Sequence, residues 1–191
     1  MICSKKEYKE FISQDAKAHN RTKLSASLLG DFIWKFQILM RKLDYYDCKR
    51  KSNFIYTPIY LYYRYRYSNL GVKLGFSIPF NVFGKGLSIA HRGTIIISDK
   101  CKIGDNCRIH TCVNIGVSGN SAAPQIGNNV YIGPGVKIVG DVTIADGVCL
   151  GAGAVVVKSI TEENTTWGGV PAKKISNNSS HSMLSSRLFQ N

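Results

Sequence analysis

The sequence predicts a mainly β fold, a parallel β-helix in which each turn of the chain stacks on the turn before it. The first observation is a spacing of six between large aliphatic residues: Ile126, Ile132, Ile138, Ile144, Leu150 and Val156. The second is a column of small apolar residues four places behind: Val130, Val136, Val142, Val148 and Ala154. The third is the turn formers between them, as in Ile132-Gly133-Pro134-Gly135. A period of six fits neither a helix nor a flat strand, and it favours rungs that bury their apolar face by stacking.

The same spacing continues upstream, with one interruption. One column is formed by Ile97, Ile103, Ile109 and Ile115, and a second by Phe83, Ile89, Ile95, Cys101, Cys107 and Val113. The step from Ile115 to Ile126 is eleven residues rather than twelve, so residues 117–125 should leave the coil as a loop. With three six-residue sides to a turn, residues 83–157 give about four coils. We therefore expect the β-helix domain to span residues 74–176.

Residues 1–73 are expected to form a short α-helical region. Ser4-Lys5-Lys6-Glu7 has the spacing of a capping box. A stripe at helical spacing predicts one helix through Leu24, Leu28, Phe32, Phe36, Leu39 and Leu43. Thr57-Pro58 predicts an N-cap and first turn of a further helix that closes near Asn69 and Gly71. Residues 177–191 are expected to form a flexible C-terminal tail.

Composition narrows the partners and the location. The net charge is +13, and residues 1–75 hold 15 Lys and Arg against 6 Asp and Glu. No zinc-finger, RNP-like or recognition-helix pattern accompanies this charge, so we expect no nucleic-acid partner. The six cysteines show no metal-ligand spacing, which predicts no metal site, and Cys101 and Cys107 occupy an apolar column. Reduced thiols and a polar start of the chain predict a cytoplasmic protein.

The Tyr- and Arg-rich segment 59–67 leaves two interpretations open. Tyr and Arg bury apolar bodies and keep polar tips wet, which suits peripheral contact with the inner face of a membrane. Alternatively the segment caps the open end of the solenoid or packs on a neighbouring subunit. We favour the cap, because a first coil exposes unpaired edge groups.

His91 is the candidate catalytic residue. It lies six places before Ile97, in a column otherwise filled by isoleucine. An imidazole at this position indicates either that the six-residue register shifts before Ile97 or that the ring has a catalytic role. The ordinary pKa of histidine, near 6.5, suits a general base that deprotonates a hydroxyl. His110 follows Ile109 at a corner, where we expect an exposed ring.

Three features resemble the hexapeptide-repeat acyltransferases: the hexads, the Ala90-His91-Arg92-Gly93-Thr94 segment and the closing Gly169-Val170-Pro171-Ala172-Lys173. The nearest branch is that of serine O-acetyltransferases and polysaccharide O-acetyltransferases. The resemblance implies a left-handed β-helix, a homotrimer, and acetyl-CoA as co-substrate between adjacent prisms, with no metal. It implies that His91 is the base. It places the pantetheine arm against Gly133, Pro134 and Ala152, and the phosphates near Lys158 and Lys173.

Two departures from the serine enzymes predict a different acceptor. Ala123 stands where those enzymes have a second active-site histidine, and Phe76 where the base has an acidic partner. We therefore predict O-acetylation of a surface polysaccharide of capsule or O-antigen type, or of its precursor, with Phe76, Phe80 and Tyr131 facing the sugar. Three alternatives stay open: serine O-acetylation in cysteine biosynthesis, N-acetylation of an amino-sugar nucleotide, and a non-catalytic trimeric scaffold.

Overall fold

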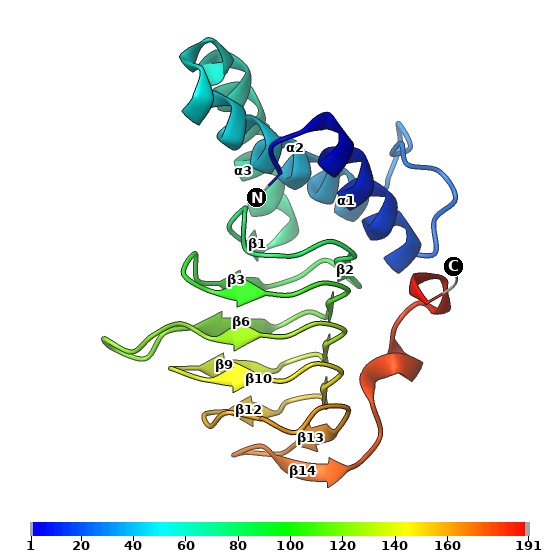
Figure 1. Ribbon diagram of the computed structural model, residues 1–191, viewed down its shortest axis with the longest axis vertical. Helices are drawn as coiled ribbons and strands as arrows, with labels where there is room; N and C mark the ends of the chain where they lie inside the picture. The colour runs from blue at the N-terminus through cyan, green and yellow to red at the C-terminus, as the bar shows by residue number, and fades with distance from the viewer. Residues whose placement is uncertain (1, 190–191) are drawn as a thin grey trace.

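The computed structural model describes residues 2–189, with a group of helices set on one end of a β-prism (Figure 1). The helical part comprises α1 (Lys5–Ala18), α2 (Phe32–Ser52), the 3-10 helix η1 (Phe54–Tyr56) and α3 (Thr57–Leu74). The predicted capping box is present at the start of α1, where Ser4 and Glu7 bond reciprocally. We call α1, α2 and α3, with their connections, the helical cap.

The prism has three sheets of short strands. One contains β1 (Phe76–Ser77), β3 (Ile95–Ile97), β6 (Val113–Gly116), β9 (Lys137–Val139) and β12 (Val155–Val156). A second contains β4 (Lys102–Ile103), β7 (Gln125–Ile126) and β10 (Thr143–Ile144). The third contains β2 (Ser88–Ile89), β5 (Arg108–Ile109), β8 (Tyr131–Ile132), β11 (Cys149–Leu150), β13 (Thr166–Gly168) and β14 (Lys173–Ser176). Every described pair is parallel except β13–β14, so the predicted parallel β-helix is confirmed.

The core of the prism consists of the predicted columns. Ile97, Ile115 and Ile138 pair in register through one sheet, and Ile103, Ile126 and Ile144 through the next. All six side chains are buried. The loop expected from the eleven-residue step projects from the prism between β6 and β7 (Figure 1). Each coil thus buries its apolar face against the coils above and below it.

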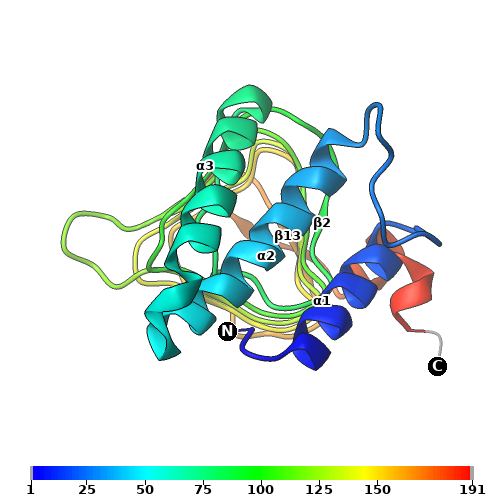
Figure 2. The same ribbon diagram turned by 90° about the horizontal axis from the view of Figure 1, so that it is seen from above.

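The helical cap covers the first coil and extends its core. Seen from above, the three helices lie across the end of the stacked coils (Figure 2). Phe36 of α2 stacks on Tyr67 of α3 with ring centroids 4.6 Å apart, and it meets Phe76 of β1 edge-on at 5.0 Å. These residues belong to one continuous cluster with the columns of the prism. The favoured interpretation of segment 59–67 as a cap is confirmed for the buried Tyr60 and Tyr67, whereas Leu61, Tyr62 and Tyr65 of the same segment are exposed.

A buried polar network joins the cap to the first coil. Arg41 binds Asp15 through two hydrogen bonds, of 2.8 and 3.1 Å, and donates to the carbonyls of Phe83 and Gly84. Asp15 in turn accepts from the backbone N–H groups of Gly86 and Leu87 at 2.8 and 2.9 Å. No further coil precedes these backbone groups, so they cannot pair with another strand. Side chains of the cap supply their hydrogen-bond partners instead.

Two helix boundaries differ from expectation. The helix expected from Leu24 begins only at Phe32, because Asp31 takes a left-handed φ of 52° and the preceding segment is irregular. The last helix continues past Gly71 to Leu74 and ends at Gly75, whose φ of 78° suits glycine. Gly71 is buried inside the helix, where a Cβ would lie 3.1 Å from the carbonyl oxygen of Phe76. This close approach, rather than a helix end, accounts for the glycine.

The cysteines are only partly as expected. Cys3 and Cys48 form a disulfide between the start of the chain and α2, so the expectation that all thiols are reduced is wrong. Cys101 and Cys107 are free and buried in the coils, as expected. Within residues 2–189, no helix has the length and apolarity needed to cross a bilayer. The cytoplasmic location stays a prediction.

The C-terminal segment lies against the prism and the cap. It contains the 3-10 helices η2 (Ser180–Met183) and η3 (Ser186–Leu188). Ser180 donates to the carbonyl of Asn129, and Ser185 donates to the carbonyl of Lys17 in α1 at 2.8 Å. Figure 1 shows the segment rising along the prism to α1. Its expected flexibility stays a prediction.

Candidate active site

His91 lies in an enlarged corner of the prism, not in the isoleucine column. Ile89 pairs with Ile109, twenty residues on, whereas Ile97 pairs with Ile115, eighteen residues on. The corner at residues 90–94 therefore holds two residues more than the regular hexads, and Ile89 takes the column position. The register assigned to His91 from the sequence was wrong in this respect. Its imidazole is exposed at the corner instead of stacked inside the coil.

Three aromatic side chains come together at this corner on successive coils. The His91 and His110 ring centroids are 5.7 Å apart, and those of His110 and Tyr131 are 5.3 Å apart. The Tyr131 hydroxyl lies 3.3 Å from Nε2 of His110. His110 is half-buried, so the expectation of a freely exposed ring is wrong. Burial, helped by the charges of Arg108 and His91, lowers the pKa of His110, so its ring is neutral at neutral pH.

A cavity of about 420 Å³ lies beside His91 and is shared with the helical cap. Arg92 lines it from the corner, and Arg21, Asp31 and Trp34 line it from the cap. Arg21 and Asp31 form an ion pair of 2.8 Å there. No sequence pattern indicates that the cap takes part, because Arg21, Asp31 and Trp34 lie 57 to 70 residues before His91. The cavity offers an imidazole and guanidinium groups to a small anionic molecule.

The residues assigned to the coenzyme lie at the same corner further down the prism. The Gly135 N–H donates to Thr111 and the Gly153 N–H to Pro134, so these corners stack coil on coil. Gly133 is packed so closely that a Cβ would lie 2.7 Å from the carbonyl oxygen of Leu150. Pro134 and Ala152 are exposed. The edge below His91 is therefore built from small residues that expose backbone to an incoming molecule.

The two predicted lysines lie together at the far end of the prism. Lys158 and Lys173 line one cavity of about 310 Å³, with Trp167 and Pro171 in the same lining. Both lysines are exposed. No group of three or more His, Cys, Asp or Glu suited to a metal ion occurs within residues 2–189. The cavity combines cations with an aromatic surface, which suits a phosphorylated aromatic ligand.

The residues expected to bind a sugar do not form one surface. Phe76 is 7% exposed and packs on Phe36 in the core. Phe80 lines a cavity of about 430 Å³ beside α3, together with Phe76. Tyr131 lies apart from them, at the His91 corner. Ala123 is buried and presents no polar group.

Comparison with known proteins identifies the repeats and the fold. Residues 123–158 match the family model described as bacterial transferase hexapeptide (six repeats). Serine acetyltransferase from Staphylococcus xylosus is 38% identical over 88 residues, which are 44% of this chain and 41% of that protein. Serine acetyltransferase from Synechococcus elongatus is 33% identical over 95 residues, 48% of this chain and 38% of that protein. The chain spans about two fifths of the length of these curated relatives.

The solved structures extend the likeness over most of the chain. Serine acetyltransferase from Brucella abortus superposes with a TM-score of 0.71 at 23% identity, covering 92% of this chain and 71% of that one. The soybean apoenzyme gives 0.68 at 25% identity, covering 88% and 69%. These structures support the whole arrangement of helices on a left-handed β-helix.

The comparisons overturn the predicted acceptor. Curated relatives and structural neighbours alike are named serine acetyltransferases, so the polysaccharide prediction is wrong and the serine alternative is the better supported one. Ala123 and Phe76 do not exclude serine, because the cavity beside His91 is lined by other polar groups, among them Arg21, Asp31 and Arg92. The chain carries the hexapeptide repeats of bacterial transferases, on a left-handed β-helix with the fold of serine acetyltransferases.

Proposed function

We propose that the protein is an acetyl-CoA-dependent serine O-acetyltransferase. The observation that carries the proposal is the position of His91. It lies beside Arg92 in one cavity, at the top of an edge of small residues that continues down the prism to Gly153. The names of the relatives support serine as the acceptor.

In this mechanism His91 takes the proton from the serine hydroxyl as the oxygen attacks the thioester carbonyl. The tetrahedral intermediate then collapses, the carbon–sulfur bond breaks, and coenzyme A leaves as a thiolate that receives the proton from the imidazolium. O-acetylserine and coenzyme A are the products, and no other reactant is needed. Most of the rate gain comes from holding both substrates at one corner, with the base adding about 100- to 10,000-fold.

Recognition of the amino acid rests on groups of this chain that differ from those expected by resemblance. Arg92 supplies a guanidinium for the serine carboxylate, in the two-pronged geometry that suits this pair. The neutral His110, next to Tyr131, positions the His91 ring in place of the acidic partner that Phe76 cannot provide. Ala123 takes no part.

The coenzyme fits the edge below His91. Gly133, Pro134 and Ala152 leave room for the narrow pantetheine arm, and Lys158 and Lys173 suit its phosphates. Because this edge is open in a single prism, we include a homotrimer in the proposal, in which a neighbouring prism closes the cleft. Light scattering at micromolar concentration should give three times the chain mass, and a monomer would remove the closed cleft.

The test is turnover with L-serine and acetyl-CoA, followed by release of free thiol. We expect a kcat/KM for serine of at least about 10,000 per molar per second, the lower end for an enzyme on its own substrate. His91→Ala should lower kcat by about 100-fold or more. His181→Ala, a histidine of the C-terminal segment, is the matched control and should leave kcat unchanged. No thiol release above that without serine would refute the proposal.

A further inference from the structure

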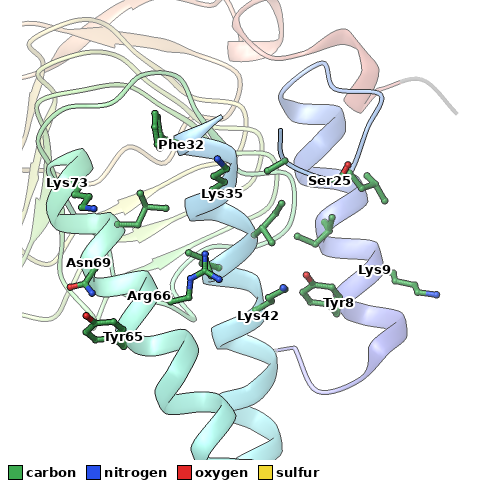
Figure 3. Close-up of a pocket in the computed structure, with 16 residues that line it drawn as sticks. Tyr8, Lys9, Ser25, Phe32, Lys35, Lys42, Tyr65, Arg66, Asn69 and Lys73 are labelled. Atoms are coloured by element: carbon green, nitrogen blue, oxygen red, sulfur yellow. The ribbon is translucent and has the colours of Figure 1, made fainter. Parts of the chain in front are cut away.

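The outer face of the helical cap contains a basic groove that the proposed reaction does not use. It lies between α1 and α3, over α2, and has a volume of about 830 Å³. Five cationic side chains line it: Lys9, Lys35, Lys42, Arg66 and Lys73. Figure 3 shows them coming from all three helices, with the coils of the prism behind. We call this the cap groove.

The charge of the cap groove is not neutralised locally. Among the residues that the structure describes, no Asp or Glu lines the groove. The acids of α2 are used elsewhere: Asp44 pairs with the buried Arg41, and Asp47 with Arg50 and Lys51. The acid near Lys35 is Asp31, which already pairs with Arg21, so the five cations create a positive potential over the end of the molecule. The groove therefore suits an anionic partner and repels a second copy of itself.

The partner must also offer an apolar region. The floor of the cap groove includes Ile12, Leu39 and Leu70. At one end, Leu28 and Leu29 are 92% and 85% exposed. Lys35 of the groove donates to the carbonyl of Leu28 at 2.8 Å, which holds this segment at the groove. Two adjacent leucines almost fully in water are not needed to bind a soluble anion or a nucleic acid.

We propose that the cap groove docks the protein on a bilayer that contains anionic phospholipid. The lysines and Arg66 contact lipid phosphates, and Leu28 and Leu29 enter the headgroup region. The prism extends from the opposite side of the cap, so the docked molecule points its coils away from the surface (Figure 1). The His91 corner, on the side of the prism, stays open to solvent. This inference does not depend on serine being the acceptor.

The test is sedimentation of the full chain with vesicles of phosphatidylcholine alone, or with about 30% phosphatidylglycerol. We expect binding only to the anionic vesicles, weakening as salt is raised. Lys9→Glu with Lys73→Glu changes one lysine of α1 and one of α3, the helices on the two sides of the groove. This pair should weaken binding by about 30-fold or more, at roughly fivefold for each basic residue near the surface. Thermal melting checks that each variant is folded.

The matched control is Lys100→Glu with Lys102→Glu, two exposed lysines of the prism with the same change in charge. It should bind the anionic vesicles within about twofold of the parent. Equal losses in the two double variants would overturn the proposal, because total charge and not the cap groove would then control binding. Equal binding to both kinds of vesicle would also overturn it.

A second pair of variants separates a bilayer from a soluble anion. Leu28→Asn with Leu29→Asn should weaken vesicle binding at least fivefold while leaving serine turnover unchanged. Glycerol phosphate at millimolar concentration should not displace the vesicles. Displacement by it, tighter binding to a DNA duplex than to vesicles, or pairing of two trimers through this face in light scattering would each overturn the proposal.

Discussion

The prism and the helical cap are stabilised by opposite means. In the prism, identical apolar contacts recur on every coil, and the columns are buried without a charged side chain among them. In the cap, the contact with the first coil depends on the buried Arg41 and Asp15 and on the buried Gln37, whose amide donates to the carbonyl of Leu87 at 2.8 Å. The difference follows from position: an inner coil pairs its backbone with two neighbours, and the outermost coil has only one. Repeated apolar contacts stabilise the interior of a solenoid. Its end is stabilised by individual polar contacts that do not recur on other coils.

The largest expected effect in this comparison is at Arg41. Arg41→Met removes the cation shared by Asp15 and Asp44 and leaves two buried carboxylates without it. We expect the free energy of unfolding to fall by about 3–5 kcal/mol, measured by urea titration. Arg50→Met is the control, since Arg50 also pairs with an aspartate but is a third exposed, and it should cost about 1 kcal/mol or less. Similar losses of unfolding free energy in both variants would show that the buried network contributes no more than a partly exposed ion pair.

The Cys3–Cys48 disulfide should have the next largest effect. It closes a loop with a sequence separation of 45 across the cap, and the other four cysteines are free. Reduction should lower the free energy of unfolding by about 2–4 kcal/mol, because the unfolded chain gains freedom. Urea titration with and without dithiothreitol measures this, and Cys3→Ser should no longer respond to the reductant. A protein equally stable in both conditions would contradict the pairing.

Asp44 should make the cap sensitive to pH. Burial raises its pKa to about 6 from 3.8, although Arg41 and the Asn81 N–H oppose the shift. The folded state therefore holds the proton more tightly than the unfolded chain, and this stabilisation, complete below about pH 4, is lost as the pH rises through 6. Asp44→Asn keeps an oxygen for the Asn81 N–H and should gain about 1–3 kcal/mol over the parent between pH 4 and 7. A difference that stays flat with pH, in urea titrations at each pH, would refute this.

The smallest effect concerns His110, beside the enlarged corner of the prism. His110→Ala should lower kcat for serine by about tenfold, because His91 loses the ring beside it. The KM for acetyl-CoA and the melting temperature should not change, which distinguishes positioning from a structural role. Tyr131→Phe, which keeps the ring and removes only the hydroxyl near Nε2, should show a smaller loss. A raised KM with normal kcat would assign His110 to binding instead.

The prism could be predicted from the sequence because each column repeats its signal. Ile126, Ile132 and Ile138 report the same environment three times, and the eleven-residue step before Ile126 marks the loop. The corner at His91 could not be assigned from spacing. Ile95 follows Ile89 by six residues, so the repeat looks unbroken, although Ile97 and not Ile95 occupies the next position of the column that contains Ile89. The sequence did hold a signal for His110. A regular coil takes eighteen residues, and His110 follows His91 by nineteen, so the two side chains are expected near the same corner on successive coils.

The cap could not be predicted to the same depth. Arg41 and Asp15 are 26 residues apart and belong to different helices, and no periodicity links such a pair. Apolar spacing alone predicts a helix from Leu24, whereas in the structure Leu28 is exposed to water and α2 starts after Asp31. A contact that occurs once in a fold produces no periodic pattern in the sequence. Its two partners can be identified only from the three-dimensional structure.

The stacked corners are spaced at regular intervals along the prism. The small residues below His91 advance by one coil at a time, at about 4.8 Å per step, from Thr111 through Gly135 to Gly153. The distance along the prism between His91 and each of these corners is thus set by a whole number of coils. A change in that number would alter the reach required of the acyl donor by a fixed increment, while every apolar column stayed in register.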